Sequence, residues 1–435
     1  MALFQKNLKM KSCTFLLNSI FVVIGYFSFG QTAPSELDKK VDQIHRKIFT
    51  VDSHTDTPLQ LMNPGFDISK RHDPVKDHSK IDFPRMKEGG LDGAFFGVFV
   101  SQGKRTPERY YHAMKRADAI IDSVYAMLGR YPDEAGLAVS PSDAYRLKRQ
   151  GKQAIFLGME NGYPIGVDVS LIKTYYAKGV RYITLCHTRN NDICDSSTDS
   201  TEFGGLSDFG KNVVRYMNKT GMMVDVSHIS DRAFYDVLSV SKAPVIASHS
   251  CARALCDNPR NLDDDMLRAL AKNGGVIQMC ILSAYVKKQK PYPARDSAVA
   301  ALRKKFRNFD NLSKTEREEA RKAWDALDDI YPQELATVPD VADHIDHIVK
   351  VAGIDHVGIG TDFDGGGGVK DCVDASQMKN ITRELVKRGY STGDIRKIWG
   401  ENLLRFWGRC NSRCICFCSR YHDRCHYRYK WEIHA

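Results

Sequence analysis

Histidine and acidic residues stand at the ends of several short apolar runs in this chain, and these side chains are common ligands of catalytic metal ions. His54 and Asp56 end the first run two residues apart, so in a strand their side chains point to the same face. A lone carboxylate, Glu160, ends a later run, where burial without a partner would be costly. Four further runs end in His187, His228, His249 and the pair Asp362 and Asp364.

Each of these residues, taken alone, is more often a satisfied core side chain than a metal ligand. Their shared position at six strand ends favours one metal site, because the carboxyl ends of parallel strands meet at one rim of a barrel. Imidazole and carboxylate ligands without a thiolate suit zinc, with manganese or cobalt as substitutes. Five such ligands exceed what one open zinc needs, and they fit two zinc ions that share a carboxylate and hold a hydroxide between them.

The elements that would position these residues are eight short, β-rich apolar runs between residues 48 and 365. Near-continuous apolar strands that alternate with helical segments indicate a parallel sheet covered on both faces. Eight such units predict a TIM-like (β/α)8 barrel. The candidate metal ligands at its rim would make it a barrel of the metal-dependent hydrolase type. The predicted strands are 49–56, 93–100, 154–160, 182–187, 222–228, 244–249, 275–282 and 356–362.

A long charged stretch, residues 283–339, interrupts the seventh predicted β/α unit. Within it, Ser313 and Glu316 have the spacing of a capping box that begins a helix. We therefore expect an inserted helical segment that projects from the end of the barrel where the strands terminate. Such a segment would serve as a lid or a dimer contact, or else it would be a solvated decoration.

The formal net charge of +10 would suggest nucleic acid as a partner, but its distribution argues against this. Residues 1–30 carry three lysines and no acidic residue, and residues 409–435 carry six basic residues against two acidic ones. The remaining body carries only +3 and has no long basic stripe that could follow phosphates. We therefore expect no nucleic-acid partner.

Residues 1–30 have the pattern of an export signal, because three lysines precede an apolar run that ends near small residues. A start at Met10 would give a more compact signal. The run is short for a membrane span, so an uncleaved anchor is the weaker alternative. No second such run follows, and we expect a mature chain without a stable membrane span that is periplasmic or secreted.

The composition changes abruptly after Trp407 and becomes rich in Cys, Arg, Tyr and His. We predict that residues 31–408 form the catalytic barrel and that residues 409–435 form a disordered tail. The alternative for the tail is a metal site built from its cysteines and histidines.

In combination and in this order, these residues resemble the membrane (renal) dipeptidase family, including its bacterial members. The resemblance spans roughly residues 48–408, nearly the whole predicted barrel. Mammalian members end in a lipid-anchor signal, and this chain shows no hydrophobic C-terminal tail, so no such anchor is expected. The matching stretches are 52–56, 158–161, 184–188, 225–228, 248–250, 259–261 and 360–365.

The resemblance implies a cofactor, two zinc ions, and a role for each ligand. His54 and Asp56 would hold the first ion. His228 and His249 would hold the second, and Glu160 would bridge the two. The resemblance also favours a homodimer.

Three residues would then act on the substrate that the resemblance implies, a dipeptide. Asp362 would handle the proton, first as general base and then as general acid. His187 would bind the scissile carbonyl and stabilise its oxyanion. Arg260 would clamp the free carboxylate of the dipeptide with its planar guanidinium, so a dipeptide would fit and a longer chain would not.

Two other functions stay open at this point. One is another two-metal barrel hydrolase that acts on cyclic amides, lactams or esters, for which Arg260 would have no free carboxylate to clamp. The other is a non-catalytic exported binding protein on the same scaffold. It is disfavoured because all the expected polar residues are present.

Overall fold

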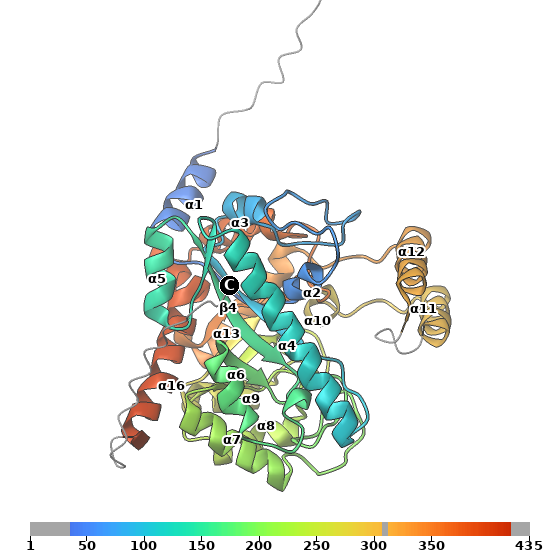
Figure 1. The fold of residues 1–435 in the computed structure, drawn as a ribbon. Helices are drawn as coiled ribbons and strands as arrows, with labels where there is room; N and C mark the ends of the chain where they lie inside the picture. The colour runs from blue at the N-terminus through green and yellow to red at the C-terminus, as the bar shows by residue number, and fades with distance from the viewer. Residues whose placement is uncertain (1–34, 307–311, 419–435) are drawn as a thin grey trace, which may run out of the picture.

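The computed structural model describes residues 35–306 and 312–418, so the predicted export signal (1–30, or from Met10) and the end of the predicted tail (419–435) lie outside it. Eight parallel strands form a nearly closed barrel surrounded by helices, which confirms the predicted (β/α)8 fold (Figure 1). The barrel strands are β1 (Val51–Thr55), β2 (Gly93–Phe99), β4 (Gln153–Glu160), β5 (Val180–Thr184), β6 (Met223–Asp225), β7 (Val245–Ser250), β8 (Val276–Met279) and β9 (Val357–Ile359). They pair in chain order from β1 to β9.

All eight predicted strands are present, but several of them end earlier than predicted. The prediction extends two strands to His187 and His228, whereas β5 ends at Thr184 and β6 at Asp225. Both histidines therefore stand on the loops that follow these strands. A ninth strand, β3 (Ala135–Leu137), pairs with β4 beside the barrel. It was not predicted because three residues are too few to show a periodic pattern.

The seam between the first and last strands closes without a continuous ladder. The amide of Asp56 donates to the carbonyl of Phe363 at 2.8 Å, and the amide of Asp362 donates to the carbonyl of His54 at 3.0 Å. An isolated parallel bridge pairs Thr55 with Phe363. Three predicted site residues therefore contribute their backbone to the closure of the barrel.

Helices cover the outside of the barrel, and most of them begin at a residue whose side chain caps the helix. These helices are α1 (Glu36–Lys47), α2 (Thr57–Leu61), α3 (Phe83–Gly89), α4 (Pro107–Arg130), α5 (Pro141–Arg149), α6 (Leu171–Ala177), α7 (Asp208–Thr220), α8 (Asp231–Val240), α9 (Asp264–Asn273), α13 (Val338–Ala352), α14 (Lys379–Lys387), α15 (Thr392–Arg396) and α16 (Asn402–Cys418). The side chain of Thr106 caps α4 ahead of Pro107. Within the described ranges, no helix has the length and hydropathy that a bilayer crossing requires.

The inserted helical segment lies between β8 and α13, in the seventh β/α unit, as predicted. Its helices are α10 (Ser283–Val286), α11 (Pro293–Lys305) and α12 (Lys314–Ile330). The predicted capping box of Ser313 and Glu316 begins α12. Figure 1 shows α11 and α12 standing away from the barrel as a separate pair.

Two buried clusters form the core. The larger lies between the strands and the helices, and the smaller fills the barrel interior toward the amino ends of the strands. In the smaller cluster, Trp407 of α16 packs edge-on against Phe95 and Phe156, with ring centroids 6.1 and 5.8 Å away. Cys410 continues the buried face of this helix, so the boundary predicted at residue 408 falls inside α16. α16 continues through residues 409–418, and the rest of the predicted disordered tail falls on residues outside the described ones.

Candidate active site and metal centre

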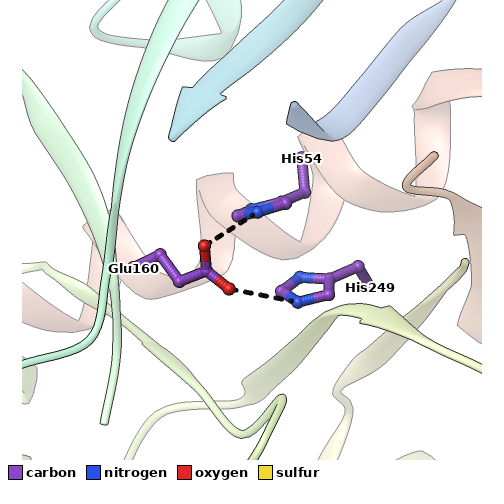
Figure 2. A group of neighbouring side chains, drawn as sticks. All are labelled: His54, Glu160 and His249. Atoms are coloured by element: carbon purple, nitrogen blue, oxygen red, sulfur yellow. Dashed lines mark ion pairs between the residues drawn. The ribbon is translucent and has the colours of Figure 1, made fainter. Parts of the chain in front are cut away.

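The carboxyl ends of the barrel strands bring the predicted metal ligands together. His54 lies in β1, and Asp56 follows that strand directly. Glu160 is the last residue of β4, His249 lies in β7, and His228 stands just past β6. Figure 2 shows the Glu160 carboxylate reaching between the imidazoles of His54 and His249.

Glu160 is the centre of this cluster. Its Oε2 atom lies 3.4 Å from Nε2 of His54. Its Oε1 atom lies 3.0 Å from Nε2 of His228 and 3.5 Å from Nε2 of His249. The two oxygens of one buried carboxylate thus face different histidines, which is the arrangement that a ligand shared by two cations requires.

The chemistry of the cluster fits metal ions. Nε2 of His54 and Oδ1 of Asp56 are buried and have no hydrogen-bond partner among the described residues. The Nε2 atoms of His228 and His249 face each other at 2.8 Å. Buried polar atoms without partners are costly, and cations would satisfy them. The described residues form three groups in which the possible ligand atoms all lie within 4.8 Å of one another. The groups are His54, Glu160 and His249; Glu160, His187 and His228; and His54, Asp56 and Asp362.

Burial and neighbouring charges act on the protons of the cluster in opposite directions. Burial would raise the pKa of Glu160, but His54 and His187 outweigh it and hold that pKa well below its ordinary value. Burial lowers the pKa of His249 to about 3. Burial also lowers the pKa of His54, but the carboxylate of Glu160 reverses this and raises it to about 10. A proton on His54 and a metal ion would therefore compete for the same carboxylate.

Asp362 follows β9 and stands at a strained backbone position. Burial raises its pKa, the charge of His54 opposes this, and the charge of Glu160 adds to it, so the pKa is about 7. Its φ of 62° is left-handed, a conformation that costs about 1–3 kcal/mol for a non-glycine residue and that clusters at functional sites. In the described part of the chain, five non-glycine residues have positive φ, and four of them follow strand ends at this rim: Asn161, His228, Asp362 and Asp364.

Gly365 leaves the space in which two of these carboxylates approach each other. A Cβ at this position would lie 2.1 Å from Oδ2 of Asp56 and 2.4 Å from Oδ1 of Asp362. Any side chain would therefore push the two acids apart. The close approach of Asp56 and Asp362 therefore requires glycine at position 365.

Arg260 lies on the loop between β7 and α9 with only 3% of its surface exposed. It donates one hydrogen bond to the carbonyl of His249 at 3.1 Å, and its guanidinium lies 5.3 Å from the ring centroid of Tyr285. Its Nε atom has no hydrogen-bond partner, and no described carboxylate forms an ion pair with it. A buried guanidinium without a carboxylate is costly, so this position is suited to bind an anion.

His187 is the most accessible of the histidines around Glu160. Its side chain is 23% exposed, against 3% for Glu160, and its Nε2 atom lies 3.7 Å from Oε1 of that residue. Its ring packs edge-on against Phe99, with centroids 4.8 Å apart. Burial lowers the pKa of His187, so its neutral imidazole can donate a hydrogen bond to a bound molecule.

The sequence did not predict the residues that contact the Nδ1 atoms of His54 and His249. Oη of Tyr182 lies 2.7 Å from Nδ1 of His54, and Oγ of Ser248 lies 2.8 Å from Nδ1 of His249. The signal for Ser248 was available, because it directly precedes a predicted ligand. The signal for Tyr182 was weaker: one hydroxyl within an apolar strand.

Comparison with known proteins agrees with this geometry. The family model of the membrane dipeptidases (peptidase family M19) matches residues 38–413. Dipeptidase tcpJ of Claviceps purpurea is 32% identical over 347 residues, which cover 78% of this chain and 72% of that protein. Among solved structures, the probable dipeptidase PvdM from Pseudomonas aeruginosa is 33% identical, with a TM-score of 0.76, and the match covers 88% of this chain and all of that one (100%).

A more distant structure shares the fold. The metallo peptidase from Rhodobacter sphaeroides, liganded with a phosphinate mimic of the dipeptide L-Ala-D-Ala, is 22% identical with a TM-score of 0.68. The match covers 83% of this chain and 99% of that one. With the family model matched over most of its length, this chain belongs to the membrane dipeptidase family, peptidase family M19.

Proposed function

We propose that this chain is a binuclear zinc dipeptidase. The observation that carries the proposal is the division of the Glu160 carboxylate, whose Oε2 faces His54 and whose Oε1 faces His228 and His249. Membership of the family supports metal-dependent hydrolysis of dipeptides. Two buried atoms near Glu160, Nε2 of His54 and Oδ1 of Asp56, have no hydrogen-bond partner among the described residues, and this supports a site for cations.

In this proposal His54 and Asp56 hold one zinc ion, with Glu160 as the shared ligand. His228 and His249 hold the other. Bound there, the two ions would lower the pKa of a water molecule and polarise the scissile carbonyl. The side chains that would hold the ions stand at strand ends or on the loops directly after them, so the barrel would fix where the two ions bind.

The remaining residues act on the substrate. The Asp362 carboxylate lies beside His54 and Asp56. As a water oxygen bonds to the scissile carbonyl carbon, Asp362 takes a proton from that water, and it passes the proton to the amine nitrogen as the C–N bond breaks. Nε2 of His187 donates a hydrogen bond to the carbonyl oxygen as negative charge develops there. Arg260 binds the free carboxylate of the substrate with its unpaired Nε and its terminal nitrogens. Bound in this way, the C-terminal carboxylate of the substrate would lie one residue beyond the scissile bond.

The proposal is tested by metal analysis combined with a substrate panel. The purified protein should contain about two zinc ions per chain, as a shared-carboxylate site requires, and should lose activity with a chelator. It should hydrolyse dipeptides and leave N-blocked dipeptides and tripeptides nearly untouched. A metal content near zero in protein purified without chelator would refute it. Turnover of lactams or esters, with dipeptide KM unchanged in Arg260→Ala, would favour the other hydrolase class.

We further propose that residues 1–30 direct export to the periplasm or the medium and that the mature protein forms a homodimer. The lysines and the apolar run of that segment support export. Mass spectrometry of the N-terminus of the exported protein should find cleavage near residue 30, and light scattering should give twice the mass of one chain. An intact N-terminus on the membrane would support an anchor instead.

A further inference from the structure

Two of the proposed zinc ligands are supported in the same way, with a hydroxyl on one ring nitrogen and Glu160 on the other. Nδ1 of His54 meets Oη of Tyr182 at 2.7 Å, and Nδ1 of His249 meets Oγ of Ser248 at 2.8 Å. The opposite nitrogen, Nε2, lies 3.4 Å from Glu160 in His54 and 3.5 Å in His249. An imidazole binds a metal through a nitrogen that carries no proton, so the partner of Nδ1 decides whether Nε2 is available.

The direction of the Tyr182 hydroxyl follows from its second partner. Oη lies 3.1 Å from the backbone carbonyl of Ser53, which can only accept a hydrogen bond. The hydroxyl therefore donates to Ser53, and its lone pair accepts the N–H of His54 Nδ1. The proton of the neutral ring then stands on Nδ1, and Nε2 faces Glu160 with a free lone pair.

The Ser248 hydroxyl is directed by a carboxylate. Oγ of Ser248 lies 2.6 Å from Oδ2 of Asp225. Asp225 is surrounded by donors, because the amides of Ser227 and Ser248 each reach its Oδ1 at 3.0 Å and the hydroxyl of Thr184 reaches its Oδ2 at 2.5 Å. Ser248 therefore donates to Asp225 and accepts the N–H of His249 Nδ1, which again leaves Nε2 for a cation.

The barrel interior is shaped around the Tyr182 ring. A Cβ on Gly158 would lie 2.0 Å from Cζ of Tyr182, so only glycine at this point of β4 leaves room for the ring. The ring of Phe95 also stacks on the ring of Tyr182, with centroids 5.3 Å apart. Gly158 precedes Glu160 on the same strand, so one strand supplies both the shared carboxylate and the space for the tyrosine behind His54.

We infer that Tyr182 and Ser248 are positioning residues of the metal centre: each hydroxyl keeps the proton of its histidine on Nδ1 and presents Nε2 to a zinc ion. The inference rests on the proposed binuclear function and extends its machinery to the carbonyl of Ser53 and the carboxylate of Asp225, which direct the two hydroxyls. Loss of such an outer partner weakens metal binding by about 10–100-fold.

The test compares the zinc affinities of variants of the full chain. Tyr182→Phe and Ser248→Ala each remove one hydroxyl and little else. Tyr175→Phe and Ser250→Ala are matched controls, because these hydroxyls are also buried and have no hydrogen-bond partner in the part of the chain that the structure covers. Each protein is stripped of metal, its thermal unfolding is recorded, and zinc is titrated against a chromogenic chelator.

We expect one of the two zinc ions to bind about 10–100-fold more weakly in Tyr182→Phe and in Ser248→Ala, with wild-type affinity in both controls. Ser248→Thr keeps the hydroxyl and should keep the affinity. Zinc affinities equal to those of the controls would overturn the inference, as would a loss of affinity in Ser248→Thr equal to that in Ser248→Ala. A wild-type chain that binds no zinc would instead refute the proposed function itself.

Discussion

The two ends of the barrel interior are built from the same strands with opposite chemistry. Toward the amino ends, Phe95, Phe156 and Trp407 pack ring against ring in a buried aromatic cluster. Toward the carboxyl ends, the strands finish in buried acids and imidazoles, several of whose polar atoms have no hydrogen-bond partner among the described residues. Four residues that follow these strand ends have left-handed backbone. The aromatic end raises the free energy of unfolding. The polar end lowers it, which is typical of a functional site.

β4 shows the contrast within one strand. Phe156 packs into the aromatic cluster, and Glu160 ends the same strand at the centre of the proposed metal site. Packing of Phe156 in the core therefore also holds the end of β4 that carries Glu160. The two ends should therefore respond differently to substitution: one in the free energy of unfolding, the other in catalysis.

The largest expected effect is on catalysis, at the polar end. Asp362→Asn keeps the shape of the side chain but cannot accept the proton, so kcat for dipeptides should fall by about 10²–10⁴-fold. The free energy of unfolding should change little. Steady-state kinetics and denaturant unfolding measure the two, with the exposed Asp371→Asn as control. Dipeptide turnover at the wild-type rate by Asp362→Asn would remove this residue from the mechanism.

The next effect is on stability, at the aromatic end. Trp407→Ala removes a fully buried ring and should lower the free energy of unfolding by about 3–5 kcal/mol. Zinc affinity and kcat should be unchanged at temperatures where the variant is folded. Trp407→Phe should lose less. A weaker zinc site in Trp407→Ala would break the comparison, because it would show that the two ends are energetically coupled.

A third prediction concerns pH and lies outside both ends. His45 of α1 is buried, with Nε2 2.7 Å from Oγ1 of Thr382 and Nδ1 3.1 Å from the carbonyl of Gly90. Burial lowers its pKa from 6.5 to about 4, so the unfolded chain binds this proton more readily than the folded one. The contribution of neutral His45 to the free energy of unfolding is complete above pH 6.5. It is lost as the pH falls through 4, and the loss is on the order of 3 kcal/mol.

The measurement is a comparison of unfolding free energies between the wild type and His45→Gln from pH 7 to pH 4. The gap between the two proteins should narrow as the pH falls, because only the wild type has this histidine to protonate. A gap that stays constant would show that His45 does not titrate on unfolding. The comparison also separates acid loss of the fold from protonation of the metal ligands.

The smallest expected effect measures the strain at the polar end. Asp362→Gly and Asp362→Ala both remove the carboxylate, but only glycine adopts the left-handed backbone without cost. The metal-free glycine variant should be more stable than the alanine variant by about 1 kcal/mol. Thermal unfolding of both would measure this difference. Equal stabilities would mean that the backbone at this rim stores no strain.

Much of this contrast could be predicted from sequence. The proposed ligands His54, Glu160 and His249 end runs of apolar residues, and local order along the chain is enough to place such residues at one rim. The contact of Tyr182 with His54 joins residues 128 positions apart, and no periodicity carries that information. The continuation of α16 past residue 408 was hidden for a similar reason, since the face of Cys410 is buried only by the rest of the barrel.

The seam between β1 and β9 has a consequence for folding. The amide of Thr361 meets the carboxylate of Asp52 across 309 residues of sequence, and the seam bonds of Asp56 and Asp362 span a similar length. Closing a loop of such length costs more conformational entropy than closing a short one, so we expect these contacts to form late in folding. A chain still under synthesis therefore lacks both the closed barrel and Asp362. We therefore expect the site to assemble only when the seam between β1 and β9 closes.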